Sequence, residues 1–293
     1  MQAVELTFGR PNQADPHEVL ERGDIVLFRQ TPFDMPAAER EFILSVRLNP
    51  EFHKNIAYKP NTDRISGVAK LEADSVTKLH DTLRNYSRRT VEFAAQVLPR
   101  YQSHWRPDYA SLRPVEEQGR ELPLKKRNDL LHTDAFPTRP TNGDMILRIF
   151  TNVNPSKPRV WITSDPFEAL ANRYAAPAGL AAAARPDPLF GVRKALGNLG
   201  LPVIARSPYD RFMLGFHDYL KMNDAFQRDC PKYRFEFPPG ATWMVFTDVV
   251  PHSVESGQFA MEQTMIVSHK SLADPRRAPI AILEKLAGCG LTG

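Results

Sequence analysis

The chain has 293 residues, of which 42% are hydrophobic, and a formal net charge of +4. This composition supports a sizeable core, and the absence of any run of about 18 apolar residues excludes a membrane-spanning helix. Two cysteines are too few for a disulfide framework, and Met1–Glu5 has neither the basic start nor the apolar run of a signal peptide, so we expect free thiols and a cytoplasmic protein.

Residues 1–120 are expected to be mainly helical with a few strands, and to form a buttress for the rest of the chain. A strand is predicted at 25–28 and a helix at 36–47. Apolar residues recur every three or four positions over 74–101, which predicts the longest helix. This helix is expected to pack on a sheet; the alternative is that its basic face meets lipid headgroups.

Residues 125–164 and 231–270 are predicted to supply the strands of the core. The predicted strands are 145–151, 159–163, 233–237, 242–246 and 258–267. Between the two regions, residues 165–230 form a helical insertion. The insertion and the C-terminal end are expected to contain an Ala/Gly/Pro-rich linker at 175–184, a helix at 209–227 and a closing helix at 279–287. Together the elements predict a single α+β domain, 1–293, with a double-stranded β-helix (jelly-roll) core and helices packed on one sheet.

A His-x-Asp pair, His132 and Asp134, precedes a turn-rich segment and a strand. Side chains two residues apart on an extended segment project from the same face, so both can bind one ion. His252, which follows the strand 242–246, is the expected third ligand. Two histidines and one carboxylate form the facial triad of non-haem Fe(II) oxygenases, which leaves three positions for a cosubstrate and dioxygen. The alternative is that His132 is an ordinary polar residue and Asp134 a turn former.

A 2-oxo acid cosubstrate needs a cation for its distal carboxylate, preferably the planar fork of arginine. Arg148 is the first candidate because it lies within an apolar strand, where a lone charge is costly to bury. The alternative is an internal salt bridge, and Arg159 is the second candidate. Residues 253–268 contain no lysine or arginine, so the last strand offers only neutral partners such as Gln263 and Thr264.

Two features outside the predicted metal site have more than one interpretation. His217, on the predicted helix 209–227, is interpreted as a solvent-exposed histidine, with a substrate-facing side chain as the alternative. Basic clusters at 88–89, 125–127 and 276–277 attract polyanions, but no nucleic-acid-binding motif accompanies them, so we expect no nucleic-acid partner. We interpret this charge either as an ordinary solvated surface or as a surface for an anionic lipid leaflet.

Five strings of the sequence resemble one family, the bacterial 3-deoxy-D-manno-oct-2-ulosonic acid (Kdo) hydroxylases. They are His132–Gly143 with Ile146–Pro155, Pro158–Trp161, Phe237–Asp248 and Ser256–Thr264. The similarity extends over most of the chain, from about Asp24 to the closing helix. These strings are far more specific than the His-x-Asp pair alone.

The resemblance implies an Fe(II)- and 2-oxoglutarate-dependent dioxygenase that uses O2 to hydroxylate the 3-position of a Kdo sugar on lipid A, giving Ko. It implies iron ligation by His132, Asp134 and His252, with ascorbate as the reductant in vitro. Kdo-bearing lipid A is then the partner, met at the cytoplasmic face of the inner membrane. Two alternatives remain: the same chemistry on a protein side chain or small metabolite, and a non-catalytic jelly-roll module that binds sugar.

Overall fold

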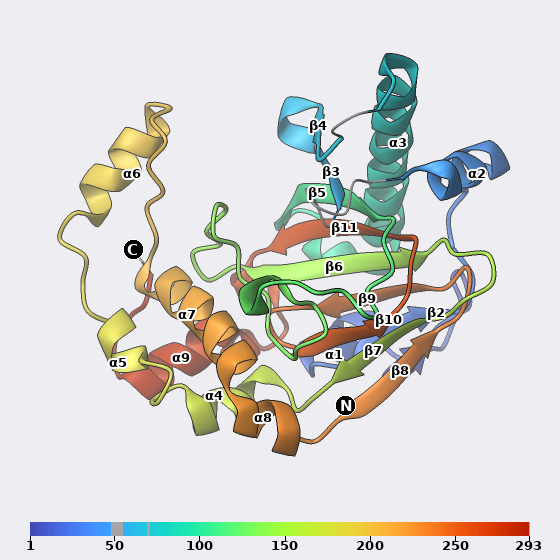
Figure 1. Ribbon diagram of the computed structural model, residues 1–293. Coiled ribbons are helices and arrows are strands. Elements are labelled where there is room, and N and C mark those ends of the chain that lie inside the picture. Colours follow the sequence, from blue (N-terminus) through green and yellow to red (C-terminus); the bar gives the residue numbers. More distant parts are fainter. Residues whose placement is uncertain (48–54, 69–70, 293) are drawn as a thin grey trace.

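Two β-sheets form the centre of the molecule (Figure 1). The computed structural model describes residues 1–47, 55–68 and 71–292. Within these ranges the larger sheet has eight strands in the order β1-β2-β9-β6-β11-β5-β3-β4, and the smaller has the order β10-β7-β8. The strands are β1 (Ala3–Glu5), β2 (Ile25–Phe28), β3 (Ile56–Lys59), β4 (Arg64–Ser66), β5 (Trp105–Arg113), β6 (Met145–Asn152), β7 (Arg159–Thr163), β8 (Tyr233–Phe237), β9 (Thr242–Phe246), β10 (His252–Ser256) and β11 (Ala260–Val267).

An aromatic core holds the two sheets together. Side chains alternate across β6, so Phe150 joins this core while Ile149 belongs to the core on the opposite face. The ring of Trp243 on β9 is fully buried; it stacks on Phe237 of β8, with centroids 3.9 Å apart, and meets Trp161 of β7 edge-on at 5.5 Å. This packing fixes the spacing between β6 and β7, and both strands contribute side chains to the pocket described below.

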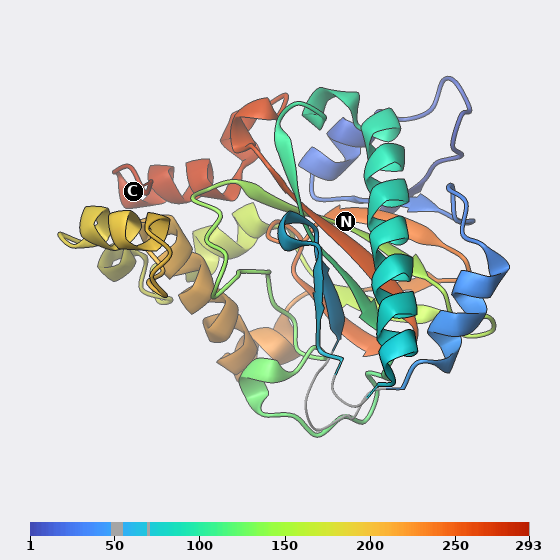
Figure 2. The same cartoon turned by 90° about the horizontal axis from the view of Figure 1, so that it is seen from above.

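Two helices from the first third of the chain, α1 (Pro16–Glu21) and α3 (Ala73–Val97), pack on the outer face of the larger sheet (Figure 2). A third, α2 (Ala37–Ser45), lies beside α3. The apolar side of α3 buries Leu83 and Phe93 against the sheet, as the sequence periodicity predicts. Part of its basic side is used in ion pairs, because Arg89 lies 2.7 Å from a carboxylate oxygen of Glu39 and Arg84 pairs with Asp63.

The helical insertion lies beside the two sheets, on the left in Figure 1. Its helices are α4 (Phe167–Tyr174), α5 (Leu180–Ala183), α6 (Phe190–Asn198), α7 (Pro208–Met222) and α8 (Asp224–Asp229), and α9 (Pro279–Ala287) closes the chain. α7 begins with a capping box, in which Ser207 and Asp210 each bond the backbone of the other. The helix predicted at 209–227 is broken at Asn223, whose side chain accepts a hydrogen bond from Phe226 N and caps α8.

The observed elements differ from the sequence expectation in several places, among them β10 (His252–Ser256), which the sequence pattern does not predict. The described part of residues 1–120, expected to hold a few strands, contains five, β1 to β5, of which β5 pairs with both β11 and β3 in the larger sheet. The sequence pattern does not predict β5, because residues 106–108 (Arg-Pro-Asp) interrupt the apolar alternation at its start. The sequence pattern also does not predict α6, because most of this helix is exposed and its described side chains form no buried apolar face. The segment 175–184, expected to be a linker, contains α5.

Two expectations about the whole chain hold in the structure. Among the described residues, no helix is both long and apolar enough to cross a membrane. Cys230 is buried, Cys289 is exposed, and both are free thiols, as predicted.

Candidate metal centre

A short backbone bridge brings His132 and His252 together. The N–H of His132 donates to the carbonyl of His252 at 3.2 Å, and the N–H of His252 donates to the carbonyl of His132 at 2.9 Å. The two imidazole centroids lie 4.8 Å apart. Trp161, on the neighbouring strand β7, stacks on the His252 ring at 5.0 Å with an interplanar angle of 20°. Two residues distant in sequence are thus held side by side by backbone hydrogen bonds and one indole ring.

Hydrogen bonds leave the Nε2 atom of each imidazole available to a metal. Nδ1 of His132 lies 2.7 Å from Leu130 O, and Nδ1 of His252 lies 2.9 Å from Val250 O. Because a carbonyl oxygen only accepts, each Nδ1 carries the proton and each Nε2 presents its lone pair. Burial lowers the pKa of both histidines, and the charge of His252 lowers that of His132 further. Both rings are therefore neutral near pH 7, as a metal ligand must be.

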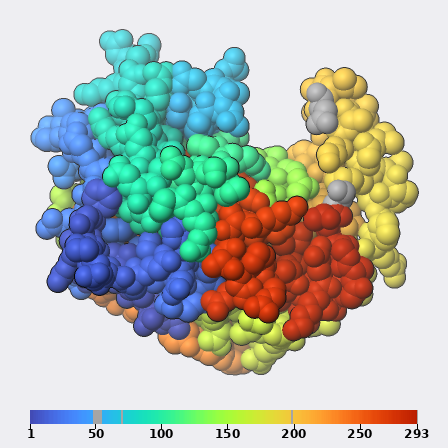
Figure 3. Space-filling view, turned by 180° about the vertical axis from the view of Figure 1, so that it is seen from behind, coloured from blue at the N-terminus to red at the C-terminus, as the bar shows by residue number. Residues whose placement is uncertain are grey.

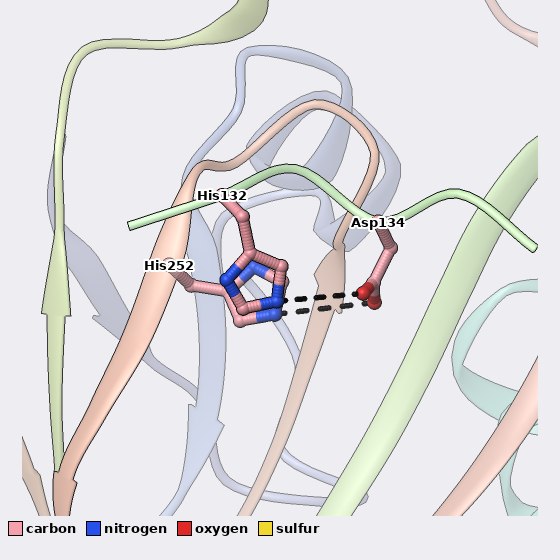
Figure 4. A group of neighbouring side chains, drawn as sticks. All are labelled: His132, Asp134 and His252. Carbon is pink, nitrogen blue, oxygen red and sulfur yellow. Dashed lines mark ion pairs between the residues drawn. The ribbon is translucent and has the colours of Figure 1, made fainter. Parts of the chain in front are cut away.

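Asp134 completes the cluster (Figure 4). Its N–H donates to Thr247 O at 2.8 Å, and its two carboxylate oxygens lie 3.9 Å from Nε2 of His132 and of His252, respectively. Burial raises the pKa of Asp134, but the charge of Arg148, whose Nε lies 3.2 Å from Oδ2, acts together with His252, His132 and a hydrogen bond from Thr247 to hold the pKa well below its usual value. One ligand atom from each residue lies within 4.8 Å of the others.

This cluster fits a ferrous ion. Oδ2 of Asp134 is buried and has no hydrogen-bond donor of good geometry in the described chain, so a ligand oxygen is left for a cation. Two imidazole nitrogens and a carboxylate oxygen on one side are the ligands that non-haem Fe(II) sites use. A pocket of about 590 Å³ opens beside them, a size that holds a cosubstrate and part of a substrate. The structure thus brings together the three residues selected from the sequence.

The four residues predicted to bind the cosubstrate do not all reach this pocket. Arg148 and Arg159 line it, whereas Gln263 and Thr264 are not among its lining residues. The side chain of Gln263 instead donates to the backbone carbonyl of Asp108, at 3.0 Å. Thr264 is buried on β11 opposite Arg148. Only the two arginines of this group are therefore in a position to meet a ligand.

The two arginines have different surroundings. Arg148 is committed to ion pairs with Asp134 at 3.2 Å and with Glu262 at 3.4 Å, so the internal salt bridge considered for it is present. Arg159 is 1% exposed and donates to Gly257 O, but its nearest carboxylate oxygen, on Glu117, is 3.9 Å away, and its Nε has no partner among the described residues. Burial lowers the pKa of Arg159 to about 10, so it remains charged near pH 7.

Helix α7 supplies pocket residues that the sequence reading missed or misplaced. His217 lines the pocket, and its Nδ1 lies 2.8 Å from Thr133 O, so the interpretation of His217 as a solvent-exposed residue is wrong. Lys221, one turn later, is 3% exposed and also lines the pocket. The spacing of four residues that puts both on one face of a helix is visible in the sequence; their contact with the metal-ligand segment is not.

A buried carboxylate behind the metal ligands predicts a pH effect on stability. Asp248 is 1% exposed, no cation pairs with it in the described chain, and burial raises its pKa to about 7. The folded state therefore binds this proton more tightly than the unfolded state, and the contribution of Asp248 to stability falls as pH rises from about 4 to about 7. Asp248→Asn removes this titration. We therefore expect the stability of the metal-free variant relative to wild type to be roughly 2–4 kcal/mol more favourable at pH 8 than at pH 5.

Urea denaturation of wild type and variant at both pH values measures this difference. The histidines of the site, with lowered pKa, push the stability of wild type in the opposite direction, but they are present in both proteins and cancel in the comparison. A variant whose stability relative to wild type is the same at both pH values contradicts the assignment.

The fold and the site together define a class. Two packed sheets that hold two histidines and one carboxylate beside a pocket are typical of the non-haem iron oxygenases. Residues 6–289 match the model of the 3-deoxy-D-manno-oct-2-ulosonic acid (Kdo) hydroxylase family, and the chain belongs to this family. The family membership and the enzyme class predicted from the motifs are thereby confirmed. None of the curated proteins matches the chain.

Solved structures similar to this chain carry the same family name. The Kdo hydroxylase KdoO, described as a non-heme Fe(II) α-ketoglutarate-dependent dioxygenase in complex with α-ketoglutarate and Fe(III), is 32% identical, with a TM-score of 0.84 and coverage of 100% of this chain and 98% of that chain. Complexes of KdoO with succinate and Fe(III) and with cobalt(II) each give 32% identity and a TM-score of 0.83, covering 99% of this chain and 97% of that chain.

Proposed function

We infer that this chain is an Fe(II)- and 2-oxoglutarate-dependent Kdo hydroxylase, and we propose that its substrate is a Kdo sugar on lipid A, which it hydroxylates at the 3-position to give Ko. The observation that carries this proposal is the convergence of His132, Asp134 and His252 on one pocket wall. These three residues would hold the iron. The metal and oxo-acid complexes of a protein similar over nearly the full length of both chains support the same cofactors here.

The distal carboxylate of 2-oxoglutarate is assigned to Arg159. This guanidinium lines the pocket, is buried, and lacks a close carboxylate partner, so an anionic ligand would offset the free energy of burying its charge. Arg148 is the weaker candidate because two carboxylates already neutralise it. Its contact with Oδ2 of Asp134 suits a different task, which is to orient that carboxylate toward the ion.

The bound metal would supply the oxidation: 2-oxoglutarate and O2 become succinate and CO2, with one oxygen atom entering succinate and the other entering a C–H bond of the sugar. The chain's own residues provide geometry and exclusion of water. Trp161 covers one face of His252, and Phe150 lines the pocket beside it. Both are almost completely buried, so they would exclude solvent from this side of the metal site.

The test uses detergent-solubilised Kdo-lipid A with the protein, Fe(II), ascorbate and 2-oxoglutarate. Mass spectrometry is expected to show the gain of one oxygen atom on the Kdo unit, and no gain with Asp134→Ala. Succinate release that is stimulated by another compound and not by Kdo-lipid A would replace the substrate. Failure to form the visible charge-transfer band of the Fe(II)–2-oxoglutarate complex would instead indicate a non-catalytic sugar-binding module.

The substrate proposal places the enzyme at a membrane surface, at the cytoplasmic face of the inner membrane. A projecting segment, residues 189–201, supports this placement: it includes α6 and stands apart from the body at the upper right of Figure 3. Four large apolar side chains on it are 49% to 78% exposed, and basic residues lie among them. They are Leu189, Val192, Leu199 and Leu201, with Arg193 and Lys194. Apolar and basic side chains together suit an anionic lipid surface.

Replacing Val192 and Leu199 with serine is expected to reduce binding to phosphatidylglycerol-containing vesicles at least about threefold, because exposed apolar area then no longer enters the lipid interface. Co-sedimentation with vesicles measures the bound fraction. Leu286→Ser, which changes an equally apolar but separate exposed position on α9, is the matched control and is expected to bind as wild type does. Equal binding by all three proteins would remove this segment from the proposal.

We also propose that residues 1–293 form one domain with a double-stranded β-helix core. Strands from the N-terminal, middle and C-terminal parts of the chain hydrogen-bond within the larger sheet, which supports a single unit. The aromatic core between the larger and smaller sheets supports a jelly-roll arrangement of the two.

A further inference from the structure

We propose that Lys221 binds the C1 carboxylate of the sugar and thereby sets the enzyme's specificity for a ulosonic acid. This inference rests on the proposed hydroxylation of Kdo. In a 3-deoxy-2-ulosonic acid the carboxylate is attached to C2, directly beside the reacting C3. A pocket that presents C3 to a metal must therefore accommodate a negative charge two bonds away, which calls for a cation.

Five cationic side chains line the pocket, and four of them have other partners. Arg113 lies 2.6 Å from a carboxylate oxygen of Glu262, and Lys125 lies 2.6 Å from one of Asp218. Arg148 pairs with the iron ligand Asp134, and Arg159 is assigned to 2-oxoglutarate. The remaining one is Lys221, which forms no ion pair in the part of the chain that the structure describes.

The surroundings of Lys221 fit a binding role. Its side chain is 3% exposed, and the single hydrogen bond given to Nζ runs to the backbone carbonyl of Lys125, at 3.1 Å. An ammonium group has three N–H donors, so two remain for a ligand. Burial lowers the pKa of Lys221 to about 8, and the more distant charges of Asp134, Asp218 and Asp129 offset this only in part. A substrate carboxylate would supply the missing compensation.

Helix α7 holds Lys221 close to the metal ligands. His217 donates through Nδ1 to Thr133 O, and its ring lies 4.8 Å from that of His132. Lys221 follows one turn later, which is about 5.4 Å along the helix. On the next helix, α8, the side-chain amide of Gln227 accepts a hydrogen bond from Leu131 N–H and donates one to Leu131 O. The helical insertion is thus fastened to the His132 segment on both sides of Lys221, so the ammonium is positioned before substrate arrives.

The experiment compares Lys221→Met with wild type on two substrates, a Kdo-bearing glycolipid and its C1 carboxamide. Wild type is expected to lose about 10- to 100-fold in kcat/KM on going to the carboxamide, the usual size of one charge-assisted hydrogen bond. Lys221→Met is expected to lose a similar factor on the carboxylate substrate and to discriminate less than about threefold between the two. Lys221→Arg, which keeps the charge, is expected to recover part of the preference.

Two controls make the result decisive. Lys126→Met changes an exposed neighbour outside the pocket and is expected to behave as wild type. The Fe(II)–2-oxoglutarate absorption band is expected to be unchanged in Lys221→Met, which shows that the fold and metal site are intact. A Lys221→Met enzyme that keeps the wild-type preference for the carboxylate overturns the inference. A wild-type preference that depends on a phosphate of the lipid, and not on the C1 carboxylate, overturns it too. Wild type that leaves Kdo unmodified would instead refute the proposed function.

Discussion

Replacing His252 with alanine is expected to weaken Fe(II) binding at least about 100-fold and to abolish hydroxylation. Residues that only orient metal ligands contribute about 10- to 100-fold to affinity, and the loss of a ligand atom itself exceeds that. The neutral Nε2 of His252, held by the Nδ1 contact to Val250 O, is one of three protein ligand atoms in the cluster. Anaerobic titration with Fe(II) in the presence of 2-oxoglutarate, followed by the visible charge-transfer band, measures the affinity.

His217→Ala is the matched control for this loss. His217 is also a pocket histidine, and its ring lies as close to His132 as that of His252 does, at 4.8 Å, but it does not belong to the cluster of ligand atoms. We expect Fe(II) binding by His217→Ala to stay within about threefold of wild type. If His217→Ala lost the metal and His252→Ala kept it, the ligand assignment would have to be exchanged between these two residues.

The metal cluster was accessible from the sequence because its geometry is mostly local. His132 and Asp134 lie two residues apart on an extended segment. Their side chains therefore point to the same face, independently of the rest of the fold. The choice of His252 required one further assumption, that the chain after 242–246 returns beside this segment. The structure confirms it, because His132 and His252 are joined by two backbone hydrogen bonds. The family motifs surround the same positions, so residue reasoning and resemblance led to one choice.

The roles of the buried cations could not be predicted in this way. Arg148 and Arg159 both lie on apolar strands, and which of them is free for a ligand depends on carboxylates far away in sequence. Glu262 lies 114 positions after Arg148 and neutralises it across the sheet. The sequence likewise did not reveal Lys221 as buried, because its burial results from the fastening of α7 to residues 125–133.

Arg159→Met is expected to raise the KM for 2-oxoglutarate about 100-fold while Fe(II) binding in the absence of the oxo acid changes less than about threefold. The proposed contact joins a buried guanidinium to a carboxylate, and such charge-assisted hydrogen bonds contribute about 1.5–3 kcal/mol each. The substitution leaves Glu117 with Arg120, 3.6 Å away, so no carboxylate is left without a cation. Succinate release at varied 2-oxoglutarate measures KM.

Arg148→Met is expected to give the opposite pattern, because the guanidinium of Arg148, although it lines the pocket, is already paired with the ligand Asp134 and with Glu262. Loss of its contact with Oδ2 frees the carboxylate to rotate and removes the charge that keeps its pKa low, so Fe(II) affinity is expected to fall about 10- to 100-fold. Once metal is saturating, the KM for 2-oxoglutarate is expected to stay near the wild-type value. An unchanged metal affinity combined with a raised KM would assign the oxo acid to Arg148, and Arg159 would then be a structural residue paired through Glu117 and Gly257.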